Sequence, residues 1–295
     1  MTHDIHIIGT GAMGCLWASY FPSSYNLHFI QRQTSCSQLV INKQPTGQVI
    51  KAKCHSYESL EKNSVQNLII ATKAFDALTA FKQVMPFLKE GAQVLLLQNG
   101  MGSQQAIQKA CNTKIALYAC SSTEGAYKSD AFTVVHAGVG ENHVGPLNTL
   151  ATQSALKNWL PSASFQWHDN IEPVLWKKLL INCAINPLTV MYDCNNGQLI
   201  DNPVYHQHMK NICHELDTLT HVLNFALPDA LPLAENICQV TYSNYSSMYQ
   251  DFKHTRQSEL EYITGFFINT CQQYNISSPE SDVLYAALLE KAAPK

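Results

Sequence analysis

The sequence has 295 residues, of which 46% are apolar and 14% charged, and its formal net charge at pH 7 is −3. This apolar share excludes a disordered chain. The slightly negative charge, with no cluster of lysine and arginine, argues against a nucleic-acid partner. Ordinary domain sizes predict two domains for a chain of this length.

The N-terminus and the cysteines bear on compartment and metal content. No basic leader precedes an apolar run at the N-terminus, and apolar runs such as Val94–Leu97 are too short to cross a bilayer. We therefore expect a cytoplasmic protein without a membrane partner. The ten cysteines show neither CxxC nor CxxxC spacing, which predicts reduced core cysteines and no metal site.

The first half of the chain alternates short apolar runs with segments of helical period, as βαβ units around a buried parallel sheet do. The predicted strands are Ile5–Ile8, Leu27–Ile30, Leu68–Thr72, Val94–Leu97 and Ile115–Ala119, and the helices between them include Ala12–Phe21 and Phe75–Leu88. A later pair, Thr133–His136 and His143–Gly145, is predicted to form a hairpin with Ala137–Asn142 as its turn.

After Trp167 the pattern changes to helical periods, which continue from Ile171 to Ala287. The junction is predicted at residues 168–170, where Asp169 or Asn170 would cap a helix with Pro173 in its first turn. Breaks in the helical pattern are predicted at Pro187, Asn196-Gly197, Pro203, Pro228 and Pro232.

A glycine-rich motif directly follows the first predicted strand and opens the first predicted helix. It reads Gly9-Thr10-Gly11-Ala12-Met13-Gly14 and fits GxGxxG. The first glycine permits a tight turn, the second lets the backbone approach a pyrophosphate, and the third allows helix and strand to pack closely. In this context the motif predicts dinucleotide binding. The predicted fold is an α/β N-terminal Rossmann domain with a mostly parallel sheet, residues 1–168, followed by an all-α domain, residues 169–295.

The end of the second predicted strand distinguishes NAD from NADP. An NAD site usually carries Asp or Glu there to bind the ribose 2′-hydroxyl, but this chain has Arg32 and no acid until Glu58. A guanidinium can bind a 2′-phosphate that a carboxylate would repel. NADP(H) is therefore the predicted cofactor and Arg32 its 2′-phosphate contact, and the alternative is a solvated loop arginine.

Two polar residues follow the third and fourth predicted strands, at the edge of the sheet where ligands bind. Lys73 could contact cofactor or substrate, and Asn99 could hydrogen-bond to both. A surface lysine and an Asn-Gly turn are equally good explanations from spacing alone.

The apolar segment Leu175–Leu188 carries a polar stripe. Lys178, Asn182 and Asn186 recur every four residues, which places them on one helix face, whereas Lys177 lies outside it. Unpaired buried polar groups cost about 1–3 kcal/mol each, so the stripe should meet partners. It suits carbonyl reduction, because a lysine can donate a proton to the oxygen that becomes negative as hydride arrives. The alternative is a structural polar network.

Polar residues near the C-terminus have a less distinctive pattern. Ser247 and Asp251 share a predicted helical face, and Glu259 opens another apolar-periodic segment. By spacing alone these residues fit cap and salt-bridge roles better than catalytic ones.

Taken together, the motifs resemble those of the ketopantoate reductase (2-dehydropantoate 2-reductase) family, from about residue 5 to residue 276. They are, in order, GTGAMG, ATKAF, QNGMG, LWKKLLINCAINPLT, CNNGQL and SSMYQD…RQSELEYITGF. The resemblance implies NADPH-dependent reduction of ketopantoate to pantoate, on the route to pantothenate and coenzyme A. It also implies an active site in the cleft between a cofactor-binding domain and a substrate-binding domain.

The resemblance assigns roles to residues that spacing leaves open. It makes Lys178 the catalytic lysine and Glu259 the active-site glutamate. It makes Asn99, Asn182, Asn186, Asn196 and Ser247 contacts of the substrate, and Arg32 and Lys73 contacts of the cofactor. The glycine-rich motif adds Gly9, Thr10, Gly11, Ala12, Met13 and Gly14 to the predicted cofactor contacts, and the position of Asn99 after a strand adds that residue.

One departure from the family pattern is Glu124, which follows Ser121-Ser122-Thr123 where many members have a threonine run. A carboxylate near the nicotinamide would add negative charge, so its role stays open. Two alternative functions also stay open: an NADP-dependent dehydrogenase of another small 2-oxo or 2-hydroxy acid, and a non-catalytic NADPH-binding sensor. The protein is expected to be a monomer or a homodimer.

Overall fold

The computed structural model describes residues 3–33, 37–111 and 114–292. The chain forms two compact units. Unit 1 holds Met1–Gln98 and Ser103–Ile171, and unit 2 holds Asn99–Gly102 and Glu172–Lys295. Four residues from the first half of the chain are therefore part of the second unit.

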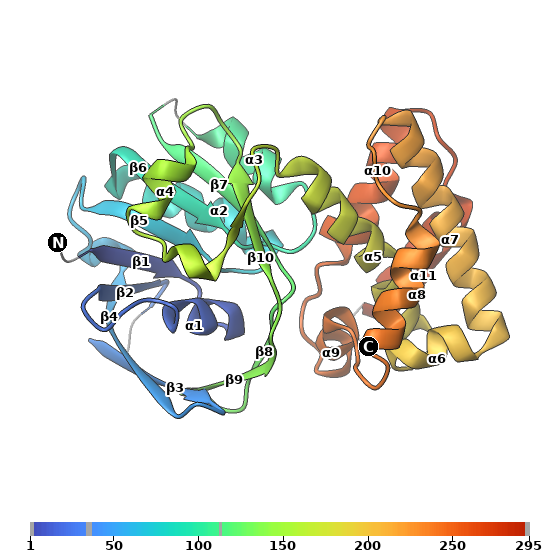
Figure 1. The fold of residues 1–295 in the computed structure, drawn as a ribbon, viewed down its shortest axis with the longest axis horizontal. Coiled ribbons are helices and arrows are strands. Elements are labelled where there is room, and N and C mark those ends of the chain that lie inside the picture. Colours follow the sequence, from blue (N-terminus) through green and yellow to red (C-terminus); the bar gives the residue numbers. More distant parts are fainter. Residues whose placement is uncertain (1–2, 34–36, 112–113, 293–295) are drawn as a thin grey trace. The chain divides into compact units, whose positions relative to one another are not determined.

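Unit 1 contains one mixed sheet of eleven strands within the described residues, in the order β11-β10-β7-β6-β5-β1-β2-β4-β3-β9-β8 (Figure 1). The strands are β1 (Asp4–Ile8), β2 (Asn26–Gln31), β3 (Gln38–Gln44), β4 (Gln48–Ser56), β5 (Val65–Ile70), β6 (Leu88–Leu96), β7 (Ala116–Ser122), β8 (Gly125–Lys128), β9 (Thr133–Gly138), β10 (Asn142–Pro146) and β11 (Gln166–Trp167). The helices of this unit are α1 (Ala12–Ala18), α2 (Ala74–Val84), α3 (Ser103–Ala110) and α4 (Gln153–Lys157).

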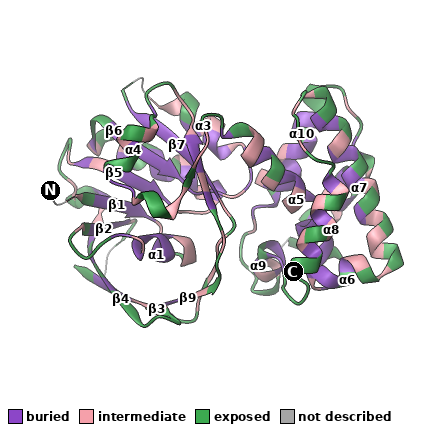
Figure 2. Cartoon of the chain, viewed as in Figure 1, coloured by how far each residue is buried: buried purple, intermediate pink, exposed green. Residues whose placement is uncertain are grey.

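The centre of the sheet confirms the predicted Rossmann architecture. Neighbours in the row β4-β2-β1-β5-β6-β7 pair in parallel, and the strand order reverses between β1 and β5, where open α/β sheets bind ligands. Alternate residues of β1 belong to two different cores: Ile7 packs with α1 and α4, and Ile8 packs with α2 and α3. Figure 2 shows the central strands buried. Both faces are covered, which explains the continuous apolar runs.

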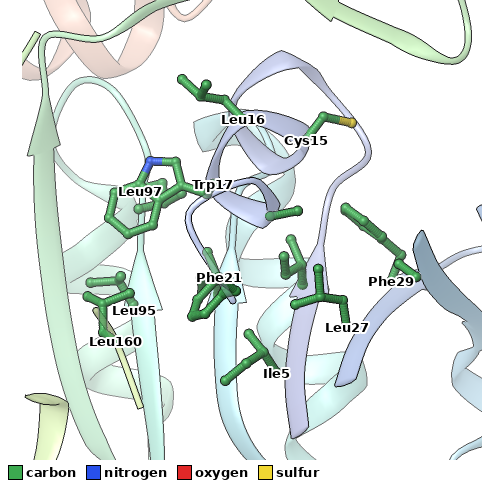
Figure 3. Close-up of a cluster of buried hydrophobic side chains, with 14 of the residues drawn as sticks. Ile5, Cys15, Leu16, Trp17, Phe21, Leu27, Phe29, Leu95, Leu97 and Leu160 are labelled. Atoms are coloured by element: carbon green, nitrogen blue, oxygen red, sulfur yellow. The ribbon is translucent and has the colours of Figure 1, made fainter. Parts of the chain in front are cut away.

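Helix α1 packs its apolar side against the sheet. Cys15, Leu16 and Trp17 are completely buried, and Figure 3 shows them above Phe21, Leu27 and other side chains of this cluster. Burying an apolar side chain as large as Leu16 contributes about 1.5–3 kcal/mol to the free energy of unfolding. This packing fixes where α1 begins, and therefore where the glycine-rich turn that precedes it lies.

The outer strands differ from the sequence-based expectation. The predicted hairpin of residues 133–136 and 143–145 is wrong: β9 pairs with β8 and β3, and β10 pairs with β7 and β11, toward the other end of the sheet order. The β3–β4 hairpin was not predicted, although Leu39 and Ile41 on one strand and Ile50 and Ala52 on the other are buried in alternation.

Unit 2 is helical, as predicted. Its helices are α5 (Glu172–Met191), α6 (Asn196–Asp201), α7 (Pro203–Val222), α8 (Ala230–Val240), α9 (Ser247–Lys253), α10 (Phe266–Gln273) and α11 (Pro279–Ala292), with a π-helical turn at Glu261–Gly265 before α10. Helix α5 packs against α7, α8, α9 and α11.

In the part of the chain that is described, no helix is long and apolar enough to span a bilayer, and no group of three or more His, Cys, Asp or Glu could hold a metal ion.

Two local predictions for unit 2 are corrected. Pro187 does not break the chain, because α5 continues through it to Met191. Pro232 lies in the first turn of α8, where a missing N–H costs no helical hydrogen bond.

At the junction, Asp169 accepts a hydrogen bond from the indole of Trp167 over 2.7 Å. Pro173 occupies the second position of α5, in its first turn, as expected.

Candidate active site

The glycine-rich turn has three glycines with different physical requirements. Gly9 has φ +107°, and a Cβ there would lie 2.8 Å from the main chain of Ala71. A Cβ at Gly14 would lie 1.9 Å from the carbonyl oxygen of Gly9, so this glycine permits the packing of α1 on β1. A Cβ at Gly11 would have no neighbour within 4 Å. The protein itself does not require glycine there, which fits a close approach by a bound phosphate group.

Polar atoms at the ends of β5 and β6 also fit a bound cofactor. Gln98 donates through Nε2 to the carbonyls of Ile70 and Thr72, over 2.8 and 3.1 Å. Its Oε1 is buried without a hydrogen-bond partner, and so is Oγ1 of Thr72. Buried polar atoms are ordinarily paired, so an acceptor and a hydroxyl of this kind suit a polar ligand at this edge of the sheet.

Arg32 directly follows β2, as the sequence predicted, and its side chain is 67% exposed. It forms an ion pair with Asp76 in the first turn of α2. Lys73 is the residue before α2, at the N-cap position. The two predicted basic residues thus flank the start of α2, at the end of the sheet where the glycine-rich turn also lies.

Lys128, at the end of β8, was not predicted from the sequence. Its Nζ donates to the carbonyl oxygen of Thr10, within the glycine-rich turn, over 3.3 Å and to that of Ala131 over 2.7 Å. The lysine is far from the motif in sequence and lies in a strand that was not predicted, so no local signal indicated its position.

The polar stripe of α5 has the predicted pattern of burial. Lys177 is exposed, Lys178 and Asn182 are half-buried, and Asn186 is buried. The ammonium group of Lys178 donates to Asn99 Oδ1 over 2.6 Å. The side chains of Asn182 and Asn186 make no hydrogen bond within the described residues. Unit 2 therefore brings together Lys178 and Asn99 and presents two uncommitted amides on the same helix.

The C-terminal candidate residues differ in burial and in structural role. Ser246, not Ser247, caps α9: its hydroxyl accepts from the amide of Tyr249 over 3.0 Å and lies 2.7 Å from the hydroxyl of Thr189. Ser247 is the exposed first residue of the helix. Asp251 is buried and pairs with Arg256. Glu259 is 4% exposed and lies just before the π-helical turn.

Asn196 has a buried side chain. It donates through Nδ2 to the hydroxyl of Thr241 over 2.8 Å, and its Oδ1 has no partner. Asn195, its neighbour, caps α6 in a capping box with Gln198. One half of the Asn196 amide is thus used to join α6 to the end of α8.

Glu124 belongs to a polar network within unit 1. It accepts hydrogen bonds from Tyr20, His136 and the amide of Gly140 over 2.8, 2.6 and 3.0 Å. Burial alone would raise the pKa of Glu124, but these donors outweigh it and lower the pKa below its usual value. The departure from the family pattern is accommodated by local partners that satisfy the extra charge.

Comparisons with known proteins identify the family of this chain. The family profile described as "Ketopantoate reductase PanE/ApbA" matches residues 5–149, and its "C terminal" counterpart matches residues 170–292. The 2-dehydropantoate 2-reductase of Vibrio cholerae is 31% identical, over 96% of this chain and 95% of that protein. That of Yersinia pestis is 28% identical, over 97% and 94%.

Solved structures share the fold. The PanE/ApbA family ketopantoate reductase of Ralstonia eutropha has a TM-score of 0.83 at 23% identity, with 98% of each chain covered. D-mandelate dehydrogenase with NADH and anilino(oxo)acetate has a TM-score of 0.81 at 23% identity and the same coverage.

The fold, the glycine-rich turn and the sequence matches define a class: this protein is an oxidoreductase that uses NADP(H). Within that class, the chain belongs to the ketopantoate reductase family, since both profiles and the Vibrio cholerae relative match nearly its whole length.

Proposed function

We propose that this protein reduces ketopantoate to (R)-pantoate with NADPH, a step toward pantothenate and coenzyme A, and that Lys178 is the general acid. The observation that carries the proposal is the hydrogen bond from Lys178 Nζ to Asn99 Oδ1. It fixes the ammonium group on the face of α5 that also carries Asn182 and Asn186. An ammonium held in this way, beside two uncommitted amides, suits a short substrate with a carbonyl, a carboxylate and a hydroxyl.

The cofactor, when bound, supplies a hydride to the carbonyl carbon of the substrate. Lys178 donates a proton to the carbonyl oxygen, so that the two transfers together form the alcohol. Before the proton moves, the ammonium stabilises the negative charge that develops on this oxygen. Asn99 holds the ammonium in position. Asn182 and Asn186 offer donors and acceptors for the hydroxyl and the carboxylate, and Ser247, Asn196 and Glu259 are further proposed contacts.

We assign the cofactor to unit 1. The main chain of Gly9–Gly14 would bind the pyrophosphate, Arg32 the 2′-phosphate and Lys73 a neighbouring group. Asn99 was predicted to contact both cofactor and substrate, and its bond to Lys178 in unit 2 favours the substrate role. In this proposal residues 1–168 bind NADP and residues 169–295, with Asn99, bind the substrate. A monomer or a homodimer is proposed, which light scattering of the purified protein would distinguish.

The test is oxidation of NADPH at 340 nm with ketopantoate and with a panel of other 2-oxo acids, phenylglyoxylate included. We expect kcat/KM to be largest for ketopantoate. A larger value for another 2-oxo acid would replace the proposed substrate. NADPH binding without turnover of any panel member would instead indicate a sensor.

A further inference from the structure

The segment Asn99–Gly102 follows β6 in the chain but belongs to unit 2. We propose that Gly100 is a positioning residue for the reaction: its missing side chain lets this segment dock on the main chain of Tyr262, and the docking holds Asn99 in place to bind Lys178. The inference rests on the proposed function, because it assigns Gly100 an effect on proton donation by Lys178.

Gly100 lies against the main chain of Tyr262. It has φ +75°, which residues with a side chain rarely adopt. A Cβ built on it would lie 2.2 Å from the carbonyl oxygen of Tyr262 and 2.7 Å from its carbonyl carbon. Both neighbours are main-chain atoms, so no side-chain rotation could relieve the overlap. Any larger residue must move the segment, the π-helical turn, or both.

A hydrogen bond fixes the segment in this position. The amide of Met101 donates to the carbonyl oxygen of Tyr262 over 2.8 Å, and Met101 is 2% exposed. Asn99 is therefore held two residues away from a buried main-chain contact. Its Oδ1 then accepts from Lys178 over 2.6 Å.

The same peptide unit also connects to Glu259. The amide of Tyr262 donates to the carbonyl oxygen of Glu259 over 3.0 Å, and that of Ile263 donates to the same oxygen over 3.1 Å. Tyr262 lies in the π-helical turn Glu261–Gly265, and such turns are frequent at functional sites. One residue thus joins the backbone of Glu259 to the segment that carries Asn99. Two proposed site residues that are 160 positions apart share one main-chain anchor.

The first experiment measures kcat, KM and NADPH affinity for Gly100→Ala. We expect kcat to fall about ten- to hundredfold, the loss expected when a hydrogen bond to a charged group is misplaced. The dissociation constant of NADPH, measured by its fluorescence, should stay within about twofold, because the proposed cofactor contacts other than Asn99 lie in unit 1. Gly91→Ala is the matched control: its φ is +76°, but a Cβ there meets nothing within 4 Å.

A second readout separates positioning from general damage. In the background of Asn99→Ala, which removes the acceptor, Gly100→Ala should cost less than about threefold in kcat, since the two changes act through one contact. The alkaline limb of the kcat profile should also move to lower pH in Gly100→Ala, because an ammonium that loses its acceptor is deprotonated more readily. Gly91→Ala should leave this limb in place.

Three results would overturn the inference while leaving the proposed function intact. They are wild-type kcat in Gly100→Ala, an equal loss in Gly91→Ala, and a full additional loss in the Asn99→Ala background. Should Gly100→Ala fail to fold, Gly102→Ala replaces it, since its Cβ would meet side-chain carbons of Phe266, at 3.2 Å, and of Tyr262, at 3.8 Å, and no main-chain atom closer than these. Gly102→Ala should lower kcat less than Gly100→Ala does, and it should not lower kcat further in the Asn99→Ala background. Wild-type kcat in Gly102→Ala would also overturn the inference. If the wild type does not reduce ketopantoate, the proposed function fails first.

Discussion

The guanidinium group of Arg32 forms an ion pair with the carboxylate of Asp76, 44 residues further along the chain. A 2′-phosphate bound by Arg32 would have to compete with this carboxylate. We predict that Arg32→Ala weakens NADPH binding about ten- to hundredfold, the value of a charge-assisted hydrogen bond. NADH binding should hardly change. Titration of both cofactors by fluorescence checks this, and equal losses would refute the assignment of Arg32.

Asp76→Asn is the matched control for that variant. It removes the competing charge and leaves Arg32 in place, so NADPH binding should become tighter. The pair is largely exposed, and such pairs contribute about 0.2–1 kcal/mol, so a gain of roughly two- to fivefold is expected. Weaker NADPH binding in Asp76→Asn would mean that Asp76 orients the guanidinium instead of competing for it.

Lys128 should affect both cofactors alike. Because its ammonium group binds the Thr10 carbonyl within the glycine-rich turn, it supports the segment proposed to bind the pyrophosphate, which NADH and NADPH share. Lys128→Met should weaken both by the same factor, about two- to tenfold. A selective loss of NADPH would instead assign Lys128 to the 2′-phosphate.

Lys178, and not Lys177, should carry the chemistry. Lys178→Ala should lower kcat about 10²–10⁴-fold, because it removes the general acid. NADPH should still bind, and Lys177→Ala, an exposed neighbour, should cost little. The wild type should lose rate at alkaline pH as the ammonium is deprotonated. Both variants are compared at saturating NADPH after a check of folding by circular dichroism. An inactive Lys177→Ala beside an active Lys178→Ala would place the active site on another face of α5.

Asn182 and Asn186 should determine substrate choice. Either change to Ala should lower kcat/KM for ketopantoate about ten- to hundredfold, since a polar group of the substrate loses its partner. The wild type should use 3,3-dimethyl-2-oxobutanoate, which lacks the terminal hydroxyl, poorly. Asn236→Ala, the same change at an exposed position of α8, is the control. Equal turnover of both substrates by the wild type would favour a dehydrogenase of another 2-oxo acid.

A histidine cluster in unit 1 should make the fold sensitive to acid. His6 stacks on His28 with ring centroids 4.8 Å apart, and His28 Nδ1 lies 2.9 Å from His55 Nε2. Burial lowers the pKa of His6 to about 4, and it also lowers the pKa values of His28 and His55. Repulsion from Lys53 lowers the pKa values of His28 and His55 further. Asp4 partly compensates for the lowered pKa values of His6 and His28. The neutral forms are therefore favoured in the folded state.

A histidine whose pKa is lower in the folded state than in the unfolded chain makes folding depend on pH. Its full contribution to the free energy of unfolding is present above the pKa of about 6.5 in the unfolded chain, and it is lost as the pH falls toward the pKa in the folded state. For His6 alone, the loss between pH 7 and pH 5 is about 2 kcal/mol. Urea unfolding at both pH values checks this. His6→Leu should reduce the difference, whereas a change of the exposed His221 to Leu should not. The same pH dependence in His6→Leu as in the wild type would exclude the cluster as its source.

Local sequence patterns predicted the centre of the fold. A buried parallel strand needs apolar residues on both faces, so β1, β5 and β6 are visible as apolar runs without a partner being known. The outer strands are different, because pairing is set by distant chain segments. Nothing in residues 133–146 indicates that β9 and β10 pair with separate strands. The β3–β4 hairpin was not predicted, although its period-two alternation of apolar residues is a local signal for strands.

The candidate site was predictable only where residues share one element. Lys178, Asn182 and Asn186 recur at helical spacing, so their common face follows from geometry. The bond between Lys178 and Asn99 joins residues 79 positions apart. Only the tertiary structure brings them together, because spacing alone left Asn99 open between a ligand contact and an ordinary Asn-Gly turn. Pro187 is similar: propensity predicts a break, but α5 packs against several other helices, α7, α8, α9 and α11 among them, and continues through it.

The assignment of Asn99–Gly102 to unit 2 limits how this protein can be recombined with its relatives. A chimaera joined at residue 168 would take Asn99 and Gly100 from one parent and Lys178 and Tyr262 from the other. The side-chain amide of Asn99 would then come from a different parent than Lys178, and Gly100 from a different parent than Tyr262. Exchange of cofactor preference by domain shuffling should therefore succeed only when residues 99–102 come from the same parent as the helical half, because the two segments form one discontinuous domain.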